Sequence, residues 1–430
     1  MMLLCIILQS AIIRRHQVFT LSNALKNQRR HPIKALLYLL ICLIAMLTVT
    51  VYMDGIDRTE AQLAATPAAM PVTARVANLD GSRYSGLQIK EMTVNGLQNS
   101  ELVRNLELAV VLIGGVGYFD PIDYKEKLHI GVTGVNSFDV LHGISPDAIT
   151  WQSGYDAEFL LGTEAACIAD ELFLRMHNRK LGDVVPLNIY YFRYDSNGAI
   201  VYEPLELADV LIVGTADMSM AQASGAFVNN VVLPFEYVRE LFHDDGLEML
   251  TSSATFGVSD PSRLNEFKSE MKKLLLFEMV TDGSAAFSVM ANIGTALLVN
   301  DAAFISAATR LQESLTLLRA FLPLLVIILA AIGYFVAYLM IQNRREEYAL
   351  LRLLGLGAGK SVLLFFTEAA ILTIAGGLIG GVTSVTFKLC ELRTGAIVFA
   401  MSSLCFFLGS LLSLWRLSRT NVMLALAQSE

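Results

Sequence analysis

Residues 343–381 read NRREEYALLRLLGLGAGKSVLLFFTEAAILTIAGGLIGG, and this stretch decides how the chain is interpreted. Its middle, GLGAGKS at 355–361, has the ending of a phosphate-binding loop. Such a loop requires a glycine, four further residues and then Gly-Lys-Ser/Thr, so that backbone N–H groups surround the phosphates. Counted back from Gly359, the first glycine would stand at position 354, but the residue there is Leu354. The spacing therefore speaks against a nucleotide site.

The residues on either side of GLGAGKS also exclude a nucleotide site. A phosphate-binding loop follows a buried strand, whereas this one follows the charged, leucine-rich segment NRREEYALLRLLG. Beyond Ser361 the chain turns at once into an apolar segment, which leaves no room for a nucleotide fold. We therefore predict a short amphipathic helix that ends at Gly355 and Gly357, with Ser361 as the N-cap of the next helix.

The composition is that of an integral membrane protein. Of the 430 residues, 54% are hydrophobic and only 17% are charged, whereas soluble proteins carry about 25% charged residues. The mean hydropathy is +0.53. Four apolar segments each approach the ~20 residues needed to span a bilayer: 35–53, 321–341, 362–387 and 395–415.

Charge is distributed unevenly between the segments. Residues 54–316 hold 35 Asp and Glu against 17 Lys and Arg, and the rest of the chain holds 5 against 15. Basic residues mark the cytoplasmic side of a membrane. We therefore expect both termini in the cytoplasm and residues 54–316 outside. The predicted segments are the cytoplasmic or interfacial 1–34, the first span 35–53, the outer domain 54–316, the second span 321–341, the cytoplasmic connection 342–361, the third span 362–387, the fourth span 395–415 and the cytoplasmic tail 416–430.

The predicted fold class is an α-helical membrane protein with four transmembrane helices and a large mixed α/β extracytoplasmic domain between the first and second. The domain opens with a polar stalk broken by Pro67 and Pro71. Its β-branched and aromatic stretches predict strands, and its helically spaced stretches predict helices. Expected are strands at 184–192 and 209–217, helices at 100–113 and 260–277 (the latter with its first residue as N-cap), and a loop at 114–117.

No signature of a soluble enzyme occurs in the chain. G-x-S-x-G and H-E-x-x-H are absent, the six histidines lack metal-ligand spacing, and no C-x-x-C is present. We therefore predict no catalytic, cofactor-binding or metal-binding residue, and no nucleic-acid partner. The apolar residues 2–13 are too short to span a membrane, and their role stays open.

Glu368 is the only carboxylate inside a predicted span. It lies seven residues beyond Ser361, roughly 10 Å along the helix, which is shallow enough for hydration or for pairing with Arg345, Arg352 or Lys360. An ionisable residue within a span is a functional hypothesis by default. A structural anchor is favoured over a proton relay, because the spans contain no acidic or histidine partner at depth.

Residues 343–381 resemble the signature of ABC transporter permease subunits of the macrolide-exporter (MacB-like) and FtsX-like type. In that family an Arg/Glu-rich segment and LR-x-LG precede a helix with an early Glu and a later pair of glycines. Stretches 162–192 and 231–241 are similar to the family's extracytoplasmic core. The matching residues of the signature are Arg344–Glu347, Leu351–Arg352, Leu354–Gly355, Glu368 and Gly376–Gly381.

The resemblance implies a multi-pass protein of the bacterial plasma (inner) membrane, surrounded by membrane lipids and paired as a homodimer or heterodimer. It implies a separate ABC ATP-binding subunit, so that this chain is no enzyme, binds no cofactor directly and depends on ATP through its partner. The segment 342–361 would couple the two subunits. The coupling residues implied are Arg344, Arg345, Glu346, Glu347, Leu350, Leu351, Arg352, Leu354 and Gly355.

Three functions remain open at this point. ATP hydrolysis by the partner would move the outer domain, either to export or extract an amphiphilic substrate such as a peptide, drug or lipid-linked molecule, or to act as an FtsX-like signalling relay. The relay would activate an extracytoplasmic partner such as a cell-wall hydrolase. The large outer domain favours transport. A sensor or adhesion protein without an ATPase is the third alternative.

Overall fold

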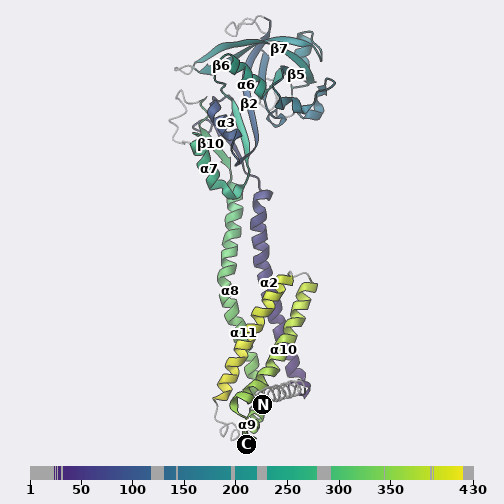
Figure 1. Cartoon of the computed structure of the whole chain (residues 1–430), viewed down its shortest axis with the longest axis vertical. Helices are drawn as coiled ribbons and strands as arrows, with labels where there is room; N and C mark the ends of the chain where they lie inside the picture. The colour runs from purple at the N-terminus through teal and green to yellow at the C-terminus, as the bar shows by residue number, and fades with distance from the viewer. Residues whose placement is uncertain are drawn as a thin grey trace, which may run out of the picture. The chain divides into compact units, whose positions relative to one another are not determined.

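The computed structural model describes residues 24, 26, 28–30, 32–117, 130–141, 144–194, 199–219, 230–277, 292–342, 344–387, 390 and 392–419. The chain forms two compact units, a helical unit from Met1–Ala65 and Ala307–Glu430 and a sheet unit from Thr66–Ser306. Figure 1 labels their helices and strands. The apolar segment 2–13 lies outside the described residues.

Four described helices are long and apolar enough to cross a membrane: α2 (Pro32–Ala69), α8 (Ala302–Gln342), α10 (Ala358–Thr386) and α11 (Leu392–Ser418). Each contains a predicted span, although the third predicted span extends one residue beyond α10. A large mixed α/β unit lies in the chain between the first and second of these helices, as the predicted fold class requires.

The helices α2 and α8 continue well past their apolar stretches. The predicted stalk is helical through Pro67, which lies in the last turn of α2 rather than breaking it. Polar side chains join the two helices at and beyond the outer ends of the predicted spans. The Tyr52 hydroxyl donates to the Leu318 carbonyl at 2.5 Å, and Arg319 pairs with Glu60 at 2.6 Å. The helices therefore pack against each other along the predicted stalk, and the break predicted at Pro67 is wrong.

Small residues allow the helices of the helical unit to approach closely. A Cβ added to Gly409 of α11 would lie 2.4 Å from the backbone nitrogen of Tyr334 in α8, and one added to Gly376 of α10 would lie 2.8 Å from Cys42 Cβ in α2. Polar side chains add to this packing, because the hydroxyls of Tyr38 and Thr373 are 3.0 Å apart. Close approach of this kind is how helices associate in an apolar solvent.

The sheet unit contains a ten-stranded sheet among its described residues. Its order is β10-β1-β9-β2-β3-β8-β5-β7-β4, and β6 pairs with both β2 and β7. Most pairs are antiparallel, while β3 pairs with β8 and β5 with β7 in parallel. The strands are β1 (Thr73–Ala77), β2 (Val103–Val116), β3 (Ile130–Val135), β4 (Thr150–Trp151), β5 (Ala166–Asp170), β6 (Val184–Tyr194), β7 (Ile200–Ala216), β8 (Val231–Pro234), β9 (Ser253–Val258) and β10 (Ala296–Asn300).

The sheet separates two apolar cores. Side chains alternate between its faces, so that in β8 Val231 and Leu233 enter the larger core and Val232 the smaller one. Buried residues of α3, α6 and α7 complete the larger core. The helices are α3 (Glu91–Gln98), α4 (Glu171–Met176), α6 (Phe235–Asp244) and α7 (Leu264–Lys273), with single 3₁₀ turns at Phe138–Val140, Pro146–Ala148, Ala157–Leu161 and Pro261–Arg263.

Three local predictions for this unit are confirmed and two are wrong. Strands cover 184–192 and 209–216, one residue short of the second prediction, and Asp260 accepts from the Ser262 N–H at the start of the predicted helix. The helix predicted at 100–113 is instead mostly β2, which continues through Gly114 in the predicted loop. Alternating Leu108, Val110 and Leu112 are all buried, so sheet pairing overrides the helical spacing.

Candidate functional site

The site is built around α9 (Arg345–Leu353), a short helix between α8 and α10. One side of it is buried through Tyr348 and Ala349. Its end is a Schellman motif, in which Gly355 N–H bonds to Arg352 O at 3.2 Å and Leu356 N–H to Leu351 O at 3.1 Å. Gly355 has φ of +89°, a conformation that glycine adopts at little cost. The helix end predicted at Gly355 is confirmed.

The next helix begins earlier than predicted. Gly357 is the N-cap of α10, and its carbonyl accepts the N–H groups of Lys360 and Ser361, each at 3.1 Å. The predicted N-cap, Ser361, is wrong, because this residue is buried inside the first turn and its hydroxyl donates to the Gly357 carbonyl at 3.4 Å. GLGAGKS is therefore the turn between two helices.

A buried ion network joins α9 to α10. The Arg344 guanidinium bonds to the Glu368 carboxylate of α10 and, through Nε at 2.8 Å, to Glu347 of α9. The Arg344 side chain is 8% exposed and that of Glu368 is 1% exposed. The guanidinium carbon also lies 4.8 Å from the ring centre of Phe365. Arg344 follows α8 in the chain, so this one side chain connects the end of α8 with both neighbouring helices.

The electrostatics of the network keep Arg344 charged. Burial works to lower the pKa of Arg344, but hydrogen bonds and charge from Glu347 and Glu368 outweigh it, and the net pKa is raised. A buried ion pair contributes little net stability, because desolvation offsets the attraction. Removal of one partner, however, leaves an uncompensated buried charge. The network therefore holds the three segments in one defined arrangement.

The partner of Glu368 differs from the predicted ones. The sequence suggested Arg345, Arg352 or Lys360, but the structure places Arg344 against the carboxylate. Arg352 is half-buried and Lys360 is exposed, while the side chain of Arg345 lies outside the described set. The pairing depends on where α8 ends, since Arg344 lies in the turn before α9. Spacing along α10 alone could not identify it.

The side of α9 opposite Tyr348 carries exposed leucines. Leu350, Leu353 and Leu354 have 53%, 65% and 78% of their surface exposed, and Glu346 lies exposed one turn before Leu350. We call Leu350, Leu353 and Leu354 the leucine face. Leu353 was missed in the predicted set, although it follows Leu350 by three residues, a helical spacing that was visible in the sequence. Leu351, which was in that set, is partly buried against the helical unit.

Of the predicted coupling residues, Arg344 is thus directed inward, and Glu346, Leu350, Leu354 and Gly355 are exposed. Glu347 is half-exposed and holds Arg344. Among the described residues, no group of three or more His, Cys, Asp or Glu side chains is arranged to hold a metal ion.

Comparison with models of protein families and with curated protein sequences finds no match. Among solved structures, the chain is similar to the extracellular domain of the "noncanonic ABC-type transporter YknZ from Gram-positive bacteria", with 15% identity over 47% of this chain and 92% of that one and a TM-score of 0.28. It is also similar to the periplasmic region of MacB from Actinobacillus actinomycetemcomitans, with 14% identity over 56% of this chain and 92% of that one and a TM-score of 0.29. Similarities this remote place the chain in no family.

Proposed function

We propose that the chain is the permease subunit of an ABC transporter and that it binds a separate ATP-binding subunit through the leucine face of α9. The observation that carries this proposal is an exposed group of leucines on a short helix that is fixed, by a buried ion network, to helices able to cross a membrane. The signature-like residues of 343–381 add support.

The leucine face suits a protein partner rather than solvent. Exposed apolar groups that lie together on an amphipathic helix are typical of a surface that enters a partner's groove. The acidic side chains of Glu346 and Glu347 border the face and would set its orientation through complementary charge. The helix α9 is short and is connected at its ends to α8 and α10. It would therefore transmit a displacement caused by the partner to these helices without bending.

The ion network gives a route for movement from α9. Arg344 ties α9 to Glu368 of α10 and follows directly from α8. The helix α8 has 41 residues, or roughly 60 Å at 1.5 Å per residue, and its first residues belong to the sheet unit. ATP-driven displacement of α9 would therefore move α8 and, through it, the sheet unit.

The proposed topology places α9 in the cytoplasm and the sheet unit outside the membrane. The basic residues around α9 and near both termini support this orientation through the positive-inside rule. Two permeases would pair, each with its ATP-binding subunit. Work done by the sheet unit would export or extract an amphiphilic substrate, since the apolar helices offer little polar lining for a water-filled path.

The proposal is tested by purification of the full chain from its own membranes. We expect an ATP-binding subunit to accompany the wild-type protein, and Leu350→Glu with Leu354→Glu to reduce its recovery at least tenfold. Both leucines are exposed, so substitution removes apolar contact with the partner and leaves the fold intact. The matched control is Leu161→Glu, which changes a leucine that is 71% exposed in the sheet unit.

Two results would contradict the proposal. If no ATP-binding subunit accompanies the wild-type chain, the permease function fails. If the subunit is retained by the Leu350→Glu/Leu354→Glu variant at the level of the control, the subunit binds at another surface. Equal membrane levels and thermal midpoints of the variants establish that binding, not folding, has changed.

A further inference from the structure

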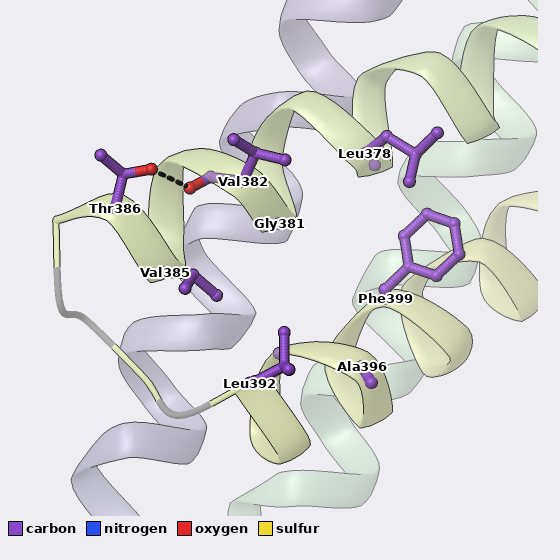
Figure 2. A pocket seen from close by; sticks show the side chains of 10 residues that line it. Leu378, Gly381, Val382, Val385, Thr386, Leu392, Ala396 and Phe399 are labelled. Carbon is purple, nitrogen blue, oxygen red and sulfur yellow. Dashed lines mark hydrogen bonds between the residues drawn. The ribbon is translucent and has the colours of Figure 1, made fainter.

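An apolar groove of about 380 Å³ lies between the last residues of α10 and the first residues of α11 (Figure 2). Figure 2 shows Leu378 and Phe399 facing each other at one end of the groove and Val385 and Leu392 near the other. Its lining is almost wholly hydrocarbon, with Thr386 as the one hydroxyl residue. The Thr386 hydroxyl donates to the Val382 carbonyl at 2.7 Å, so it places no unsatisfied polar group in the groove.

Three glycines, Gly377, Gly381 and Gly395, line this groove. Gly381 and Gly395 line it without side chains, and a Cβ added to Gly381 would meet only the terminal methyl of Met46, at 3.5 Å. At Gly377, one turn earlier, an added Cβ would lie 2.7 Å from the Phe399 ring. The helices therefore approach closely at Gly377, which itself lines the groove.

Charged groups of both signs flank the end of the groove. Arg393 directly follows the lining residue Leu392; its side chain is exposed and has no hydrogen-bond or ion-pair partner among the described residues. The next residue, Thr394, donates through its hydroxyl to the exposed carboxylate of Asp57 in α2, at 3.0 Å. An exposed cation, Arg393, thus directly follows a groove-lining residue, and an exposed anion, Asp57, is bonded to the residue after it.

We propose that the groove binds one acyl chain of a zwitterionic phospholipid, with its phosphate at Arg393 and its ammonium group at Asp57. An acyl chain matches the hydrocarbon lining, and arginine binds phosphate oxygens in a bidentate manner. Basic residues beside membrane helices bind lipid head groups in the same way. This inference rests on the membrane topology proposed above, which puts the flanking charges at the lipid head groups, but it does not depend on the ATP-binding partner.

A second groove in the same unit provides an internal comparison. It lies between α2 and α8, has a volume of about 180 Å³, and is lined by residues of 41–49 and 325–332. Its lining is apolar except for Thr48, and it lies in the middle of the apolar stretches, away from charged side chains of either sign. It can receive bulk lipid but offers no contact for a head group.

The test uses the purified full chain in lipid nanodiscs that contain a small fraction of phosphatidylethanolamine with a diazirine in one acyl chain. After irradiation, labelled positions are mapped by mass spectrometry. We expect residues 378–399 to be labelled several-fold more than residues 41–49 and 325–332. Ala396→Phe, which fills the groove, should lower that labelling several-fold. The matched control Ala400→Phe changes an exposed alanine of the same helix that does not line the groove.

The head-group contacts are tested by a diacylglycerol probe with the same diazirine chain. Wild type should label more strongly with the phospholipid than with diacylglycerol, and Arg393→Gln with Asp57→Asn should abolish that difference. Equal labelling of both grooves, an unchanged result with Ala396→Phe, or crosslinks from the groove to a second copy of the chain would each overturn the proposal. Because no ATPase is present, failure here is distinct from failure of subunit binding.

Discussion

The two ends of α10 differ in how they contact the neighbouring helices. Near α9, the buried carboxylate of Glu368 meets Arg344, and charge fixes three segments in one arrangement. Near α11, Gly381 and Gly395 line an apolar groove, and the charged side chains of Arg393 and Asp57 beside it are exposed. The comparison teaches that a buried ion pair fixes the helices at one end of α10 in a single arrangement. At the other end, an apolar groove lined by glycines can bind an apolar ligand.

The largest effect is expected from Glu368→Leu. This change leaves the Arg344 guanidinium buried with only the half-exposed Glu347, and loss of one partner of a buried pair costs about 3–5 kcal/mol. The measurement is the thermal midpoint of the detergent-solubilised full chain. Glu347→Ala is the control, since it keeps the buried pair, and its effect should be much smaller.

The double variant Arg344→Met/Glu368→Leu distinguishes the effect of the unpaired charge on stability from the effect of altered packing. It removes both charges, and replacement of a buried ion pair by apolar residues is often close to neutral. Its midpoint should therefore recover most of the loss seen in Glu368→Leu. A double variant as unstable as the single one would show that the network does not act through its charges.

An intermediate effect is expected from Gly409→Ala, compared with Gly381→Ala. The new methyl at Gly409 would meet the α8 backbone at 2.4 Å, and overpacking of this kind costs about 1–3 kcal/mol. At Gly381 the new methyl has an open side and a flexible methionine methyl as its neighbour, so we expect almost no change. Equal shifts in thermal midpoint would mean that the groove end is as tightly packed as the α8–α11 contact.

The smallest effect concerns Cys390, in the turn beside the groove. Burial raises the pKa of the Cys390 thiol, and the nearby carboxylates of Asp54 and Asp57 raise it further. Less thiolate is therefore present at neutral pH than for a free cysteine, and maleimide labelling should be slow and should continue to rise above pH 9. The rate is measured in a Cys5→Ser background.

Asp57→Asn removes one of these carboxylates and should speed Cys390 labelling modestly at neutral pH. Glu60→Gln, which changes an acid paired with Arg319, is the matched control and should leave the rate unchanged. If both variants have the same rate, Asp57 does not act on this end of the unit.

Much of the helical unit could be predicted from the sequence. Long apolar segments identify helices whatever surrounds them, because their backbone groups must bond within the segment. The end of α9 was equally local, since Gly355 can adopt a positive φ that other residues avoid. The break predicted at Pro67 was wrong because Pro67 falls in the last turn of α2, where its effect on the helix is small.

The candidate site was less accessible to prediction. The sequence near Glu368 offers several basic residues that could pair with its carboxylate, and nothing local distinguishes them. They are Arg344, Arg345, Arg352 and Lys360. Only the position of the turn after α8 directs Arg344 inward. In the sheet unit, Leu102 and Leu106 resemble a helical stripe, but β2 forms because strands distant in sequence supply its hydrogen bonds. Both of these errors concern a partner in another segment of the chain.

By itself, the sequence determined the four long apolar helices found among the described residues, the mixed unit between the first two, and the turn at Gly355. These follow from hydrophobicity and backbone preference, which act over a few neighbouring residues. Only the tertiary structure decided which arginine neutralises Glu368, which leucines of α9 remain exposed, and where glycines open a groove. Those features depend on contacts between separate segments, and close packing, not local preference, sets them.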